Sequence, residues 1–191
     1  MTNKTFNIII TGVGGQGIIT LLSIINEAAF VEGYDVKSSE LHGLSQRGGS
    51  VKSYIRFGKN VHSPLFSFGK ADLVLSLETT EALRALVYKN PKTIFVVNEN
   101  FIFFDKDISK DFITKKLNDL VKKNLYLVSA SETCKKELSN EVVSSIYLLG
   151  YCIFKGIIPL KPESVEKAIE KIIPLKYLEL NKKAFNLAKK I

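Results

Sequence analysis

Residues 6–11 place the strongest constraint on the fold, because this short apolar run, FNIIIT, is followed at once by a glycine-rich segment. A run with almost no polar residue is typical of a strand that is buried on both faces of a sheet. From Ile18 onward apolar residues recur at helical spacing, and Gly33 marks the end of that helix. Residues 34–38 then provide a second strand. This order predicts a β-loop-α-β unit of roughly thirty residues.

Residues 50–58, SVKSYIRFG, alternate apolar and polar side chains. A period of two with polar residues on one side predicts a half-exposed strand. We expect this strand to belong to a hairpin that turns at residues 58–60, where Gly58 and Asn60 favour a turn.

The rest of the chain alternates strands and helices. We expect strands at 71–78, 93–99 and 124–130 and helices at 79–90, 107–124, 140–155, 162–173 and 175–190. Ser129 and Glu132 have the spacing of a capping box at the start of a helix. The order predicts an α/β fold, a Rossmann-like three-layer sandwich with a mostly parallel sheet and an antiparallel hairpin after the second strand.

Length and composition limit the class of protein. The 191 residues, 46% hydrophobic and 24% charged, suit one globular domain with a core of its own. No apolar run approaches the ~20 residues that span a bilayer. The first ten residues carry no small-residue cleavage site of the kind that ends a signal peptide. We therefore expect a cytoplasmic protein that does not bind membranes.

The net charge of +8 raises the question of nucleic-acid binding. The lysines are spread over the whole chain, and only three of the 27 basic residues are arginines, the residue that most often reads bases and grips phosphates. We therefore expect no nucleic-acid binding, and a basic nucleic-acid-binding module is the weakest alternative. An acidic protein partner suits the same surface.

Cys134 and Cys152 are the only cysteines. Neither has a second cysteine at C-x-x-C spacing, whereas a zinc site or an iron–sulfur cluster needs about four ligands. We expect two buried free thiols and no metal bound by this chain alone.

The segment Gly12-Val13-Gly14-Gly15-Gln16-Gly17 fits G-x-G-x-x-G between a strand and a helix. Such glycines allow a tight turn, a close approach of phosphate and close packing of the helix, and amides at the helix start point at the anion. NAD binding also asks for an acid about 20 residues further on, for which Glu40 is available. The alternative is that the glycines only let the helix pack closely. The candidate anion-binding residues here are Gly12, Gly14, Gly15, Gln16 and Gly17.

A second unusual segment, ELHGLSQRGGSV at 40–51, gathers functional residue types. Gly48 and Gly49 can turn their amides toward an anion, and Arg47 adds a planar five-donor group beside them. The segment follows the second strand, so we expect it at the carboxyl edge of the sheet beside the glycine loop, where open α/β sheets bind ligands. The alternative is that Arg47 pairs with Glu40 or a carbonyl and that His42 packs on it.

The two segments together, GVGGQGI at 12–18 and ELHGLSQRGGSV at 40–51, resemble the gamma subunits and domains of 2-oxoacid:ferredoxin oxidoreductases, most closely the indolepyruvate branch. The similarity continues through residues 63–65 and 69–72 and through Glu78 and residues 81–84. Leu44 stands where methionine is common in the family. The resemblance implies that residues 1–191 form a single gamma-type domain.

The resemblance also implies a partner. In that family a large subunit, or other domains of one long chain, carries thiamine diphosphate and [4Fe–4S] clusters. The complex oxidatively decarboxylates a 2-oxoacid, here indolepyruvate or another arylpyruvate, to an acyl-CoA and passes electrons to ferredoxin. The present chain lacks cluster ligands and a G-D-G motif for thiamine diphosphate, so we expect it to be inactive alone.

Within this family we expect the 40–51 segment to face the partner's active-site cleft. Arg47, Gly48, Gly49 and Ser50 would meet a substrate carboxylate or a phosphate of CoA, and His42 and Gln46 would orient it. A stand-alone Rossmann-type NAD-dependent dehydrogenase is the alternative. It predicts tight NAD binding by the isolated chain and a proton-transfer pair near the nicotinamide. The Tyr-x-x-x-Lys spacing of such a pair occurs at 151–155, inside an apolar helix far downstream.

Overall fold

The computed structural model describes residues 5–42, 48–102 and 109–190. They contain a six-stranded sheet in the order β2-β3-β1-β4-β5-β6. β1, β4, β5 and β6 run parallel, whereas β3 is antiparallel to both β1 and β2. The strands are β1 (Phe6–Val13), β2 (Asp35–His42), β3 (Ser50–Gly58), β4 (Leu73–Ser76), β5 (Ile94–Asn98) and β6 (Leu125–Val128).

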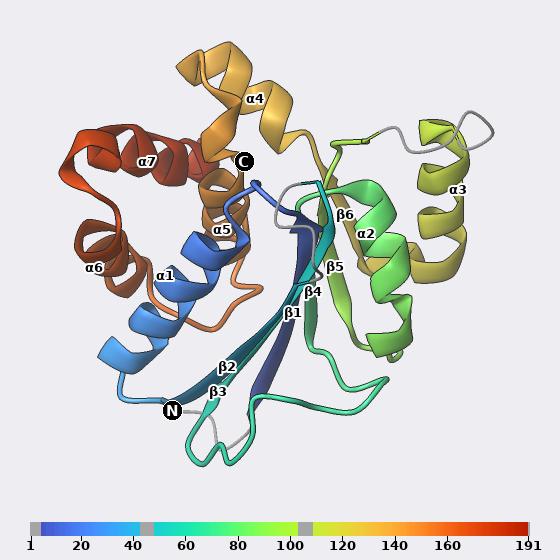
Figure 1. Ribbon diagram of the computed structural model, residues 1–191, viewed down its shortest axis with the longest axis horizontal. Coiled ribbons are helices and arrows are strands. Elements are labelled where there is room, and N and C mark those ends of the chain that lie inside the picture. The colour runs from blue at the N-terminus through green and yellow to red at the C-terminus, as the bar shows by residue number, and fades with distance from the viewer. Residues whose placement is uncertain (1–4, 43–47, 103–108, 191) are drawn as a thin grey trace.

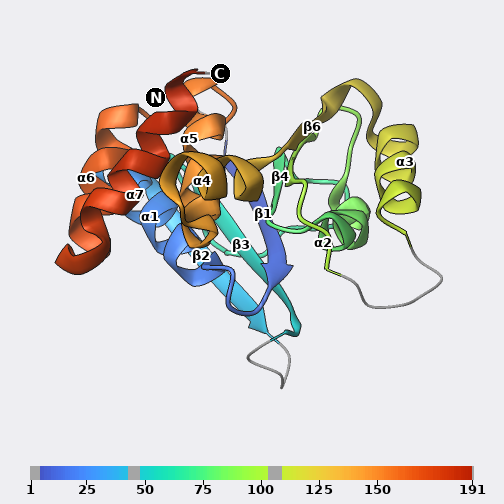
Figure 2. The same ribbon diagram turned by 90° about the horizontal axis from the view of Figure 1, so that it is seen from above.

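Helices cover both faces of this sheet (Figure 1). α1 (Ile18–Val31), α5 (Ser144–Phe154), α6 (Pro162–Ile172) and α7 (Leu175–Leu187) lie on one face, and α4 (Ala130–Leu138) joins them. The view from above shows the sheet between this group and α2 (Thr79–Arg84) with α3 (Lys110–Val121) (Figure 2). The described residues also form the short 3-10 helices η1 (Ala85–Tyr88), η2 (Lys122–Asn124), η3 (Glu141–Val143) and η4 (Ala188–Lys190). The three-layer α/β sandwich is therefore confirmed.

The buried side chains of β1 explain why its sequence is apolar on both faces. Ile8 and Ile10 pack in the larger core with α1 and α5, whereas Ile9 packs in the smaller core with α2 and α3. All three are fully buried. Because alternate side chains of a strand point to opposite faces, one central strand contributes to both cores.

Helix α5 is apolar on all sides because it lies between the sheet and α7. Each of its residues 145–153 is buried. A Cβ atom added at Gly150 would lie 2.5 Å from the carbonyl oxygen of Phe185 in α7. The absence of a side chain at this position therefore lets the two helices cross closely.

The predicted hairpin turn at residues 58–60 is wrong. β3 enters the sheet between β2 and β1, with His42 opposite Val51 and Val13 opposite Ser50. The hairpin is formed by β2 and β3, and its connection is the segment 43–49. An alternating pattern specifies which side chains of a strand are buried, but it does not specify the neighbouring strand.

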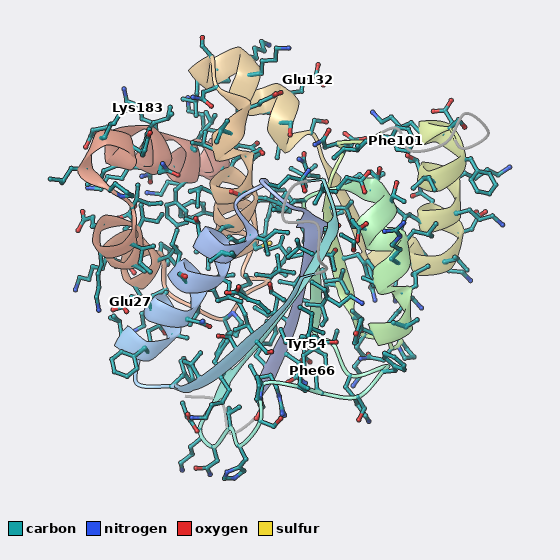
Figure 3. All side chains as sticks on the ribbon, in the orientation of Figure 1. Glu27, Tyr54, Phe66, Phe101, Glu132 and Lys183 are labelled. Carbon is teal, nitrogen blue, oxygen red and sulfur yellow. The ribbon has the colours of Figure 1, made fainter. Side chains whose placement is uncertain are left out.

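Tyr54 also departs from the expected pattern, because it is buried although it stands on the polar side of β3. Its ring packs edge-on against that of Phe66, with the ring centroids 5.5 Å apart, and its hydroxyl shares a 2.5 Å hydrogen bond with that of Tyr88. Tyr54 and Phe66 are labelled in Figure 3. Phe66 belongs to the segment after β3, which therefore covers this face of the strand.

The capping-box prediction is wrong as well. Ser129 is the N-cap residue of α4, but its side chain makes no cap hydrogen bond. Its hydroxyl donates instead to the carboxylate of Glu99, after β5. Finally, no helix within the described ranges is long and apolar enough to cross a membrane.

Candidate functional site

The two glycine segments meet at the carboxyl end of β1. The N–H of Gly14 donates to the carbonyl oxygen of Gly49 at 2.9 Å, and the N–H of Gly48 donates to the carbonyl of Gly14 at 3.4 Å. These bonds extend the β1–β3 ladder beyond its last strand pair, Val13 and Ser50. The glycine loop and the start of β3 therefore form one continuous edge.

Three of the predicted anion-binding residues build the loop itself. A Cβ atom at Gly12 would lie 2.6 Å from Gln16 Oε1 and 3.1 Å from the Cβ of Leu77, so a larger residue would displace the Gln16 side chain. Gln16 Oε1 in turn accepts the N–H of Val13 at 2.8 Å. Since Gly14 already uses its N–H and its carbonyl to pair with Gly48 and Gly49, it cannot also donate to a ligand.

Gly15 and Gly17 are placed differently. Both have positive φ angles, 103° and 80°, that favour glycine, and Gly17 is the N-cap of α1 without a side-chain cap. Within the described part of the chain, their N–H groups donate to no other residue. Together with the unpaired amides of the first helical turn, they can bind an anion at this edge.

A pocket of about 180 Å³ opens beside Gly15. Such a volume is smaller than the ~300–1,000 Å³ of a site that encloses a drug-sized ligand. Gly17 lines a separate pocket of about 520 Å³, whereas the pocket at Gly15 has room for only one polar group of a larger ligand, such as a phosphate or a carboxylate. The polar lining of the pocket at Gly15 comes from Gln16, Asn98, Asn100, Ser131, Glu141 and Ser144.

Sequence analysis missed the asparagines of this lining. Asn98 ends β5, and its amide donates to Ser131 Oγ at 2.8 Å while its Oδ1 accepts the N–H of Ser131 at 3.2 Å. Asn98 therefore holds the first turn of α4 against the sheet. Asn100 follows two residues later and lines the pocket. The signal that would have found both is their position directly at the carboxyl end of a buried strand.

Two buried acids stand behind the edge on the α2 side. Glu78 accepts the N–H of Glu81 at 2.8 Å, the N–H of Ile102 at 3.1 Å and the hydroxyl of Thr79 at 3.3 Å. Glu81 accepts the hydroxyl of Ser50 at 2.5 Å. The predicted site residue Ser50 therefore directs its hydroxyl hydrogen to a protein carboxylate.

Several predicted residues lie outside the described residues. Gln46 and Arg47 belong to the segment 43–47, and of His42 only the backbone, paired with Val51 at the end of β2, is described. Glu40 pairs with Ser53 in β2, and β3 separates β2 from β1. Since NAD-binding folds place the second strand next to the first, Glu40 stands one strand too far from the glycine loop to hold a ribose there.

Cys134 and Cys152 are both buried free thiols, as expected. Burial raises the pKa of the Cys134 thiol from 9.0 to about 11 and also raises the pKa of Cys152. Across the described ranges, no group of three or more His, Cys, Asp or Glu side chains could hold a metal ion. These thiols are therefore suited to packing and not to a cluster.

We expect both thiols to be unreactive in the folded chain. At pH 8 a pKa of 11 in place of 9 lowers the thiolate fraction about 100-fold, and burial slows attack further. Labelling with an aromatic disulfide reagent should therefore be at least about 100-fold slower in the native chain than in the same chain in urea. The contribution of Cys134 to stability is full below about pH 9 and is lost as the pH rises toward 11. Fast labelling of the native chain would contradict this burial.

Comparisons with known proteins point to one family. The family model described as "Pyruvate ferredoxin/flavodoxin oxidoreductase" matches residues 7–191. The indolepyruvate oxidoreductase subunit IorB of Thermococcus kodakarensis is 35% identical over 194 residues, 98% of this chain and 96% of that protein. The IorB subunit of Archaeoglobus fulgidus is 34% identical over 190 residues, 95% of this chain and 92% of that protein.

Solved structures agree with this match. The keto/oxoacid ferredoxin oxidoreductase gamma subunit of Geobacter sulfurreducens is similar with a TM-score of 0.70 and 25% identity, over 97% of this chain and 96% of that one. The 2-oxoglutarate:ferredoxin oxidoreductase of Magnetococcus marinus shares the fold, with a TM-score of 0.75 and 17% identity, over 99% of this chain and 31% of that one. The same fold thus also occurs as about a third of a longer chain.

Proposed function

Because the chain belongs to the pyruvate ferredoxin/flavodoxin oxidoreductase family, we propose that it is the small subunit of a 2-oxoacid:ferredoxin oxidoreductase. Its complex would oxidatively decarboxylate indolepyruvate or another arylpyruvate to an acyl-CoA and pass the electrons to ferredoxin. In this proposal residues 1–191 form one gamma-type domain, located in the cytoplasm and inactive without a large partner subunit.

One observation carries the substrate class. The identity to indolepyruvate oxidoreductase subunits reaches 35% along nearly the full length of both chains, whereas pyruvate/ketoisovalerate gamma subunits reach 28% over less of the chain. The small polar pocket supports the need for a partner. A pocket that holds only one polar group of a ligand requires a second surface to enclose the rest.

In this proposal the residues of this chain contact CoA or the substrate, and the partner subunit supplies the principal ligands of the cofactors. Thiamine diphosphate and iron–sulfur clusters belong to the partner in this proposal, since the described residues offer no cluster ligands. The backbone N–H groups of Gly15 and Gly17 would bind a phosphate group of CoA. Arg47, Gly48 and Gly49 would contact the same anion or the substrate carboxylate, with His42 and Gln46 orienting it.

A stand-alone NAD-dependent dehydrogenase is disfavoured by the sheet order. β3 lies between the glycine loop's strand and the strand that carries Glu40, so the ribose-binding acid is displaced. Tyr151 and Lys155 lie at the end of α5, where Tyr151 is buried. The dehydrogenase hypothesis requires NAD binding by the isolated chain, which calorimetric titration measures.

The test is CoA-dependent reduction of a viologen dye or ferredoxin with indolepyruvate under anaerobic conditions. Three preparations are compared: this chain, its large subunit, and the two co-expressed. We expect activity only from the co-expressed pair. Failure of the two chains to copurify, together with NAD binding by this chain alone, would replace the proposal with the dehydrogenase.

Substituting Arg47 by alanine should raise the KM for CoA or for the oxoacid by about 10- to 100-fold in the complex. The reason is that a hydrogen bond to a charged group contributes about 1.5–3 kcal/mol. We expect assembly to be intact, which copurification of the two chains measures. Unchanged KM values in Arg47→Ala would remove Arg47 from the site.

A further inference from the structure

A buried carboxylate connects α2 to the glycine-rich edge. Glu81 is 1% exposed, and its Oε2 accepts the hydroxyl of Ser50 at 2.5 Å. Its Oε1 accepts Nη1 of Arg84 at 2.7 Å. Since each carboxylate oxygen already has a donor from the protein, Glu81 faces inward and does not present an oxygen to a ligand.

Ser50 carries this link to the second glycine segment. It is the first residue of β3, directly after Gly49, whose carbonyl accepts the N–H of Gly14. A chain of contacts therefore runs from α2 through Ser50 and Gly49 to the glycine loop. Because Ser50 follows Gly49 directly in the chain, the bond to Glu81 anchors the start of β3 and with it the position of Gly49.

The position of Glu81 is itself fixed. Glu78 accepts the N–H of Glu81 at 2.8 Å as the N-cap of α2, which locks the first turn of the helix. The negative charge of Glu81 is offset by Arg84, so a buried carboxylate can stand behind an anion site without repelling its ligand strongly.

We propose that Glu81 is a positioning residue that holds Gly49, through Ser50, in place so that its N–H meets the anionic group of CoA or of the 2-oxoacid. This inference rests on the proposed function. It assigns the Ser50 hydroxyl to Glu81 and leaves the backbone of the glycine segment to meet the anion.

The experiment uses the co-expressed complex with Ser50→Ala, Glu81→Gln, the double variant and Ser50→Thr. Glu27→Gln is the matched control, because it also neutralises a carboxylate paired with a cation at 2.7 Å, but on α1 with Lys171 (Figure 3). For each variant kcat, the KM for CoA, the KM for indolepyruvate and the melting temperature are measured. The substrate whose KM responds identifies which anion binds at this edge.

We expect Ser50→Ala and Glu81→Gln each to raise one KM about tenfold, with kcat within about twofold of the wild type. The double variant should be no worse than either single variant, because both remove the same link. Ser50→Thr keeps the hydroxyl and should restore most of the affinity, and Glu27→Gln should match the wild type.

Wild-type KM values in both Ser50→Ala and Glu81→Gln would overturn the inference while the proposed function stands. So would a fall in kcat and melting temperature without a change in either KM, which is the signature of a purely structural role. An inactive wild-type complex would overturn the proposed function and this inference together.

Discussion

Replacing Glu78 by alanine is expected to lower the free energy of unfolding by about 3 kcal/mol or more. The carboxylate is fully buried and accepts hydrogen bonds from the N–H groups of Glu81 and Ile102 and from the hydroxyl of Thr79. Its removal leaves the N–H groups of Glu81 and Ile102 without this acceptor, whereas the hydroxyl of Thr79 can still donate to the carbonyl of Asn100 at 3.2 Å. A donor left unpaired in the protein interior costs much more than the loss of an exposed bond. Urea unfolding followed by circular dichroism measures the change.

Two further variants separate the causes. Glu78→Gln keeps one accepting oxygen but turns an amide N–H₂ toward a donor. We therefore expect its free energy of unfolding to lie between those of the wild type and the alanine variant. Glu137→Ala removes an exposed carboxylate from α4 and should change stability by less than about 0.5 kcal/mol. A loss no larger in Glu78→Ala than in Glu137→Ala would show that water replaces the carboxylate, and the described network would not stabilise the fold.

Replacing Gly150 by alanine is expected to destabilise the chain by about 2–3 kcal/mol. In an unobstructed helix the same change would stabilise by about 1 kcal/mol. Here the new Cβ would lie 2.5 Å from the carbonyl oxygen of Phe185 and 3.0 Å from the Cβ of Ala188, and a backbone oxygen cannot rotate away. The expected result is a lower urea midpoint with an unchanged slope.

Gly156→Ala is the matched control for Gly150→Ala. A Cβ atom added at Gly156 would have no protein atom within 4 Å, so only the positive φ of 65° at this residue opposes the substitution. We expect a loss of about 1 kcal/mol there, from backbone strain alone. Equal losses at the two positions would show that α5 and α7 separate easily and that their close crossing contributes little.

The sequence determined the local pattern of the fold because hydrophobic periodicity is written in neighbouring residues. The apolar run at 6–11 correctly predicted a strand buried on both faces, and the period of two at 50–58 correctly predicted a strand. Pairing depends on residues far apart in the chain. The insertion of β3 between β2 and β1, and therefore the hairpin at 43–49, came only from the tertiary structure.

The candidate site divides in the same way. Glycines and an anion-friendly helix start were readable at 12–17, because their spacing is local. The sequence did not show which amides stay free. Gly14 pairs with Gly48 and Gly49 across the sheet, whereas no residue in the described part of the chain accepts the N–H of Gly15 or of Gly17. The sequence by itself therefore determined which segments could bind an anion. Only the tertiary structure decided which of their atoms are available, because the competing hydrogen-bond partners come from strands and helices distant in the chain.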